Sequence, residues 1–109
     1  MGWQWLGNAM HLCVSGKCRF HLATVVGGGR WIVSTVGDYW PDGASEPERI
    51  GARRLYETYV FRAAKPHPHG CNCPQIEDLS EVDSQGYEHH DSANDGHMQM
   101  CEKWDTRTL

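Results

Sequence analysis

The stretch that decides the fold is "CRFHLATVVGGGRWIVSTVG", residues 18–37. Residues 18–26 alternate imperfectly between apolar and polar side chains, which is typical of a strand. Residues 27–29 are three glycines, which accept the positive φ angles of a tight turn. Residues 30–37 return with several β-branched side chains, which favour strands. The stretch therefore predicts a β-hairpin.

The residues after the hairpin predict a loop, a further strand and an irregular segment. Prolines and glycines interrupt residues 38–52 and predict the loop. Residues 53–63, "RRLYETYVFRA", predict a third strand in which neither face is purely apolar. Residues 75–90, "QIEDLSEVDSQGYEHH", are polar and show no clear period, so we expect them to be irregular.

The last predicted element is a helix. Ser92 is a suitable N-cap, and Asp95 three residues later resembles the second half of a capping box. Four residues recur at the spacing of one helix face: His97, Met100, Cys101 and Trp104. The sequence thus predicts an α+β fold, with a small antiparallel β-sheet of three or more strands covered by a C-terminal helix. We expect residues 1–17 to form a loosely ordered extension and residues 18–109 to form a single domain.

Composition and charge narrow the functional classes. The chain has 109 residues and a net charge of −4, distributed as +3 over residues 1–76 and −7 over residues 77–109. The acidic last third disfavours binding to duplex nucleic acid. No apolar run is long enough to cross a membrane, and the N-terminus lacks the pattern of a signal peptide, so we expect a cytoplasmic protein. Five tryptophans exceed the needs of one small core, which allows a homo-oligomer.

A metal site is one interpretation of "HPHGCNCP", residues 67–74. Cys71 and Cys73 lie on a predicted turn, and His97 and Cys101 lie one helical turn apart on the predicted helix. Together they would supply the three cysteines and one histidine of a structural zinc site. The alternative is that all four are ordinary thiols and a core histidine, because His97 and Cys101 share the core face of the helix. The sequence leaves both interpretations open.

Aromatic and arginine residues near the predicted loops are candidates for ligand binding. Tryptophan and arginine dominate binding hot spots, and arginine suits phosphate groups. The candidates are Arg30, Trp31, Tyr39, Trp40, Arg53 and Arg54. The alternative for Trp31 is a place in the core.

Three short blocks carry a resemblance to a known group of proteins. They are "STV" at residues 34–36, "YETYVF" at residues 56–61, and Tyr87 followed by a helix with "GH" at residues 96–97. In this order they resemble small, largely uncharacterised bacteriophage-encoded proteins with an STV strand, a FETMVF-like strand and a C-terminal helix with GH. Those proteins usually have no cysteine one turn after GH, so the resemblance does not support zinc. It assigns no activity to any residue.

The resemblance implies a phage accessory protein in the host cytoplasm. Small phage proteins of this kind commonly bind and inhibit a host component or sequester a nucleotide defence signal. We therefore predict a non-enzymatic protein whose partner is a host protein or a nucleotide-type small ligand. The first alternative is a zinc-stabilised nucleic-acid-binding module that uses Arg30, Arg53, Arg54 and Arg62. The second is a small enzyme that depends on a His/Cys pair or on Glu57.

Overall fold

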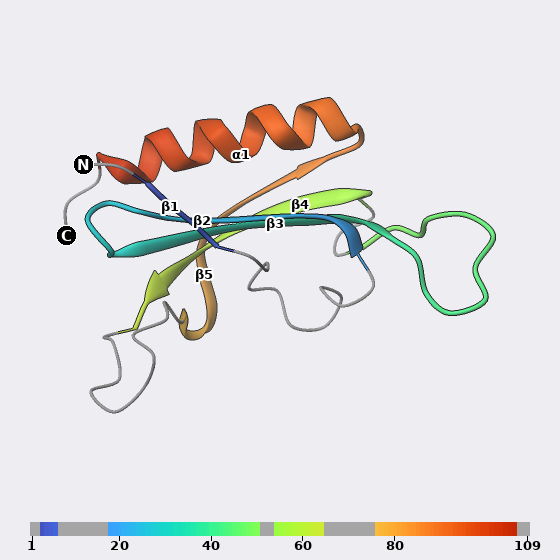
Figure 1. The fold of residues 1–109 in the computed structure, drawn as a ribbon, viewed down its shortest axis with the longest axis horizontal. Helices are drawn as coiled ribbons and strands as arrows, with labels where there is room; N and C mark the ends of the chain where they lie inside the picture. The colour runs from blue at the N-terminus through green and yellow to red at the C-terminus, as the bar shows by residue number, and fades with distance from the viewer. Residues whose placement is uncertain (1–2, 7–17, 51–53, 65–75, 107–109) are drawn as a thin grey trace.

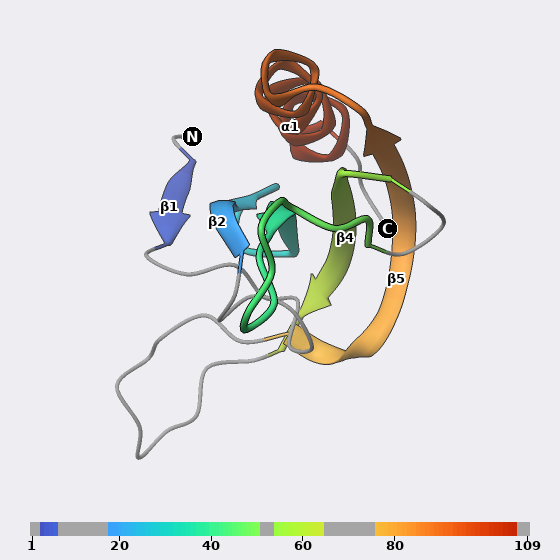
Figure 2. The same ribbon diagram turned by 90° about the vertical axis from the view of Figure 1, so that its right-hand side faces the viewer.

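The computed structural model describes residues 3–6, 18–50, 54–64 and 76–106. These residues form a five-stranded antiparallel sheet and one helix, α1 (Figure 1). The strands lie side by side in chain order: β1 (Gln4–Leu6), β2 (Cys18–Val26), β3 (Trp31–Tyr39), β4 (Tyr56–Ala63) and β5 (Ile76–Tyr87). The helix, His90–Asp105, lies along one face of the sheet, and β5 curls up beside it (Figure 2). The predicted α+β architecture, a small antiparallel sheet covered by a C-terminal helix, is confirmed.

The predicted hairpin is formed by β2, Cys18–Val26, and β3, Trp31–Tyr39. Val26 pairs with Trp31 at the turn, and the three glycines between them have φ angles of 67°, 67° and 94°. A side chain at Gly27 would come within 2.7 Å of the Trp31 ring. Glycine is therefore needed at this turn for its backbone angle and for its lack of a side chain.

Strand β4, Tyr56–Ala63, confirms the third predicted strand, although it begins later than predicted. The expectation for the next segment is wrong, because residues Ile76–Tyr87 form the twelve-residue strand β5. This strand is polar because it lies at the edge of the sheet, where few side chains need to be buried. Its pairing with β4 shifts register twice near Phe61, and such bulges bend a strand, as the curl of β5 in Figure 2 shows.

Strand β1, Gln4–Leu6, was not predicted. It pairs with residues 23–25 of β2 and so belongs to the sheet, although it lies in the segment expected to be a loose extension. Three residues are too short for a period of two to be visible in the sequence. The other residues of that segment, apart from Trp3, lie outside the described residues.

Helix α1 begins two residues before the predicted N-cap. Its N-cap is His89, which makes no side-chain capping bond, and Ser92 is already inside the helix. The predicted core face is confirmed, because His97, Met100, Cys101 and Trp104 are all buried. This face packs on Val26, Trp31, Val33 and Val60 of the sheet. Among the described residues, no helix is long and apolar enough to cross a membrane.

Candidate functional site

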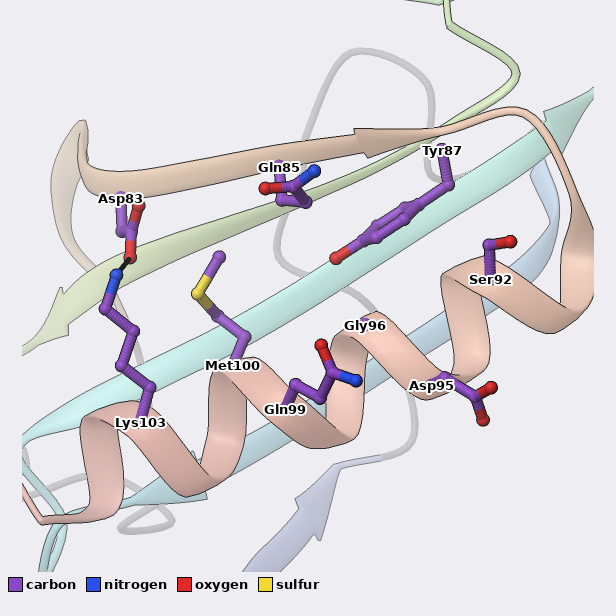
Figure 3. A pocket seen from close by; sticks show the side chains of 9 residues that line it. All are labelled: Asp83, Gln85, Tyr87, Ser92, Asp95, Gly96, Gln99, Met100 and Lys103. Atoms are coloured by element: carbon purple, nitrogen blue, oxygen red, sulfur yellow. Dashed lines mark hydrogen bonds and ion pairs between the residues drawn. The ribbon is translucent and has the colours of Figure 1, made fainter.

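A groove runs between β5 and α1 along the open side of the helix (Figure 3). Its volume is about 530 Å³. The residues that line it are Asp83, Gln85, Tyr87, Ser92, Asp95, Gly96, Gln99, Met100 and Lys103. Tyr87 and Met100 are the only large apolar or aromatic side chains among these lining residues, and Met100 is buried, so the groove suits a polar ligand.

The positions of these side chains follow from the two-residue period of strand β5 and the three-to-four-residue period of helix α1. Residues 83, 85 and 87 alternate along β5, so they project from the face of the sheet that carries the helix. Residues 92, 95, 99 and 103 are three or four positions apart on α1, so they form one stripe along the helix. The groove is the space between that stripe and the three β5 side chains.

Asp83 closes one end of the groove. Its carboxylate accepts hydrogen bonds from Lys103 Nζ at 2.7 Å, Trp104 Nε1 at 2.9 Å and the Ser84 backbone N–H at 2.9 Å. Burial alone would raise the pKa of Asp83, but these hydrogen bonds and the charge of Lys103 outweigh it, and the pKa is lowered. Asp83 therefore stays ionised and ties β5 to the last turns of α1.

The middle of the groove is more open to a ligand. Gln99, Ser92 and Asp95 make no hydrogen bond or ion pair with another described residue, and the Gln85 amide makes only a 3.5 Å contact with the Gly86 carbonyl. Their donors and acceptors are solvated rather than satisfied within the protein. A ligand that enters the groove can therefore bond to them without breaking internal hydrogen bonds.

Tyr87 reaches the helix at Gly96, where its ring lies directly against the backbone (Figure 3). A β-carbon at Gly96 would overlap this ring. Alanine is normally the better helix former by about 1 kcal/mol. We nevertheless expect Gly96→Ala to lower the free energy of unfolding by about 1–3 kcal/mol, because the ring or the helix must shift.

Urea denaturation of the two proteins measures this effect. Asn94→Ala is the matched control, because Asn94 is exposed on the same helix and lies outside the groove. We expect this control to be neutral or slightly stabilising. A Gly96→Ala protein that is as stable as the native protein would contradict the close contact between Tyr87 and α1.

The other flank of α1 is closed by aromatic rings from β1. The Trp5 ring lies 5.7 Å from the His97 ring, and Trp3 lies 6.5 Å from Trp5. His97 is completely buried beneath them. In the described part of the chain, Trp3 and Trp5 therefore cover one flank of α1, and the groove lies on its other flank, beside β5.

His97 occupies the centre of a buried chain of polar groups. Its Nε2 lies 2.8 Å from the hydroxyl of Thr24, and its Nδ1 lies 2.6 Å from the hydroxyl of Thr35. Thr35 in turn bonds Thr58 at 2.6 Å. Burial lowers the pKa of His97 to about 4. The imidazole is therefore neutral at pH 7, with one nitrogen donating and the other accepting.

The chemistry of His97 and Cys101 does not fit a catalytic pair. A nucleophilic cysteine needs a lowered pKa and access to substrate. Burial raises the pKa of the Cys101 thiol to about 11, and both side chains are completely buried. These two residues stabilise the core between the sheet and the helix.

The predicted zinc site is only partly within the described residues. Cys71 and Cys73 lie outside them. Both nitrogens of His97 already bond threonines, so zinc binding there would require one of those bonds to break. In the described part of the chain, no three His, Cys, Asp or Glu side chains are grouped to hold a metal. The zinc site stays a prediction.

Four of the candidate ligand-binding residues divide between the two ends of β3. Arg30 and Trp31 lie at the turn end of β3, whereas Tyr39 and Trp40 lie at its other end, roughly 30 Å away along the strand. Trp31 is 2% exposed and packs against Trp104, so the alternative that placed it in the core is confirmed.

Trp40 has a different environment. Arg19 stacks on its ring at 4.1 Å from the centroid, and its Nε1 donates to Asp38. Arg54 is exposed, and Arg53 lies outside the described residues. These contacts already occupy one face and the polar edge of the Trp40 indole, which leaves less of it for a ligand.

A second, smaller recess lies on the other side of β5. Its volume is about 140 Å³, and it is lined by Arg54, Glu57, Tyr59, Ser84, Gln85 and Gly86. Burial is the main cause that raises the pKa of Glu57. Glu57 and His97 belong to opposite faces of the sheet, because the neighbouring Thr58 points to His97 through Thr35. They cannot act as an acid–base pair.

The groove was not predictable from the sequence, because one of its two walls is β5, a segment expected to be irregular. The polar stripe on α1 was visible in the sequence, but a solvated helix face gives the same pattern. The described residues form a small α+β domain in which one helix lies on an antiparallel meander, with an open polar groove at the sheet edge.

No protein-family model matches the chain, and no curated protein or solved structure matches it.

Proposed function

We propose that this chain is a non-enzymatic binding protein whose binding site is the groove between β5 and α1. The observation that supports this proposal is the set of polar side chains in the groove that have no partner within the described part of the protein: Ser92, Asp95 and Gln99. These side chains can form hydrogen bonds with a partner of complementary shape and charge, and no chemical reaction is needed.

A protein partner fits the groove better than a nucleotide. Two carboxylates, Asp83 and Asp95, and one ammonium, Lys103, face the groove, and Lys103 is already paired with Asp83. A phosphate would therefore meet a site with a net negative charge and no free cation among its described lining residues. The resemblance to small phage proteins adds the expectation that the partner is a host protein that is inhibited by the contact.

A selection from a displayed library of random sixteen-residue peptides tests this proposal. The selected peptides are then measured by fluorescence anisotropy against Gln99→Trp, which fills the groove, and Asn94→Trp, which places the same ring elsewhere on α1. We expect Gln99→Trp to weaken binding at least about tenfold, which corresponds to about 1.4 kcal/mol. Asn94→Trp should leave the affinity unchanged.

Two outcomes of this experiment would refute the proposal. A selection that enriches no peptide, or peptides that bind Gln99→Trp as well as the native protein, would refute the groove as the binding site. Melting curves of both variants show whether each is folded before its affinity is compared.

A further inference from the structure

The outer edge of β5 has no neighbouring strand among the described residues. Backbone groups on such an edge are free to pair with another chain. Two contacts indicate which groups face outward: the Ser84 N–H bonds to the Asp83 side chain, and the Gly86 carbonyl is contacted by the Gln85 side chain. Both backbone groups interact with side chains of their own strand. Since Ser84 and Gly86 are two residues apart, both belong to the same side of the ladder.

The two recesses described above lie on opposite faces of β5. The groove lies on the helix side of β5, and the smaller recess, which includes Glu57 and Tyr59, lies on the opposite side. An extended peptide projects alternate side chains to opposite faces of a sheet. A strand added at Ser84–Gly86 would therefore point successive side chains alternately towards the groove side and towards the opposite face of β5.

The charge of β5 indicates which kind of segment could pair with this edge. The strand contains four acidic residues and no basic one: Glu77, Asp78, Glu81 and Asp83. On the helix side, Asp95 adds a carboxylate without an ion-pair partner among the described residues. Pairing of two β5 edges would bring like charges together, which disfavours a second copy of the chain. On the helix side, a lysine or arginine side chain of an added strand would instead meet the Asp95 carboxylate.

We propose that β5 is a docking edge for an extended, basic segment of a partner protein, which adds to the sheet as a further strand and places basic side chains in the groove. This inference rests on the proposed function and specifies its partner. The backbone of the partner would supply affinity, and the alternate side chains would supply specificity. On binding, the Ser84 N–H would leave the Asp83 carboxylate and donate to a carbonyl of the incoming strand. Asp83 would keep its hydrogen bonds from Lys103 and Trp104.

Three labelled octapeptides test the proposal by fluorescence anisotropy at 150 mM salt. The probe alternates threonine and lysine. The second peptide has glutamate in place of lysine, and the third keeps the lysines but has alternate backbone nitrogens methylated, which removes the ladder donors. We expect the probe to bind and each of the other two to bind at least about tenfold more weakly, since several hydrogen bonds or ion pairs are lost.

A charge-reversal pair on the protein supplies the matched control. Asp95→Lys changes the groove, and Asp91→Lys makes the same change on an exposed part of α1 outside the groove. We expect Asp95→Lys to weaken binding of the probe about fivefold or more, and Asp91→Lys to weaken it less than about twofold, because Asp91 lies farther from the bound strand.

Each outcome is decisive. Equal binding of the methylated peptide would overturn strand addition, because diffuse charge attraction would then explain the affinity. Library peptides that depend on the groove but are acidic, or that tolerate methylation, would overturn this inference and leave the proposed function intact. No groove-dependent binding of the library or the probe would overturn both.

Discussion

Replacement of His97 by alanine is expected to lower the free energy of unfolding by about 4 kcal/mol. The side chain is completely buried and bonds Thr24 and Thr35 through its two ring nitrogens. Alanine would leave both hydroxyls with one partner fewer in the core and would open a cavity beside Cys101. Both effects destabilise, because a buried polar group without a partner costs about 1–3 kcal/mol and a cavity adds to that cost.

Urea denaturation at pH 7.5 measures this difference, with His89→Ala as the control. His89 is exposed and makes no capping hydrogen bond, so its loss should change the stability by less than about 0.5 kcal/mol. A loss of less than about 1 kcal/mol for His97→Ala would contradict the buried threonine–histidine chain.

The same residue should make the protein sensitive to mild acid. The pKa of His97 is lowered to about 4 in the folded state by burial, whereas an unfolded histidine titrates near 6.5. Between these values the unfolded chain binds more protons than the folded one, so stability is lost as the pH falls from about 6.5 towards 4. The expected loss from this one group is about 3 kcal/mol at pH 4.

His97→Gln isolates this contribution, because glutamine keeps a donor and an acceptor but does not titrate. Other groups, such as Glu57, whose pKa is raised mainly by burial, are common to both proteins and cancel in the difference. We expect the stability gap between the native protein and His97→Gln to shrink by about 3 kcal/mol between pH 7.5 and pH 4. Parallel pH profiles would show that His97 is not buried as a neutral group.

The sequence predicted the elements in which the spacing of apolar side chains follows from which side chains are buried. The hairpin of residues 18–37 was predictable because three glycines separate two runs of β-branched and apolar residues. The core face of α1 was predictable because His97, Met100, Cys101 and Trp104 repeat at the helical period, and all four are buried. Strands β1 and β5 were not predictable, since one is three residues long and the other is a polar edge strand.

The blocks that carry the resemblance to phage proteins meet in space. Thr35 of "STV", Thr58 of "YETYVF" and His97 of "GH" form the buried polar chain. Tyr87 packs against Gly96, the other residue of "GH". These positions therefore specify how the helix sits on the sheet, which gives them a structural role in this chain. The membership of that group stays a prediction.

The candidate site was hidden for a related reason. Gln85, Ser92, Asp95 and Gln99 are ordinary surface residues in the sequence, and only the pairing of β5 with β4 brings the strand alongside α1. The aromatic and arginine residues looked more suggestive, but the length of β3 separates Arg30 and Trp31 from Tyr39 and Trp40. Residue type alone cannot distinguish a tryptophan of the core, such as Trp31, from one at a binding surface.

The most direct test of the groove as the binding site is a chemical-shift map of the protein with a selected peptide. The native protein, labelled with nitrogen-15, is titrated with the tightest peptide from the library. We predict that the side-chain amides of Gln85 and Gln99 and the backbone amides of Ser84 and Gly86 move most. If instead the signals of the Trp40 indole and the Tyr39 backbone amide move most while these groups stay still, the peptide binds at the far end of β3 and the groove is not the binding site.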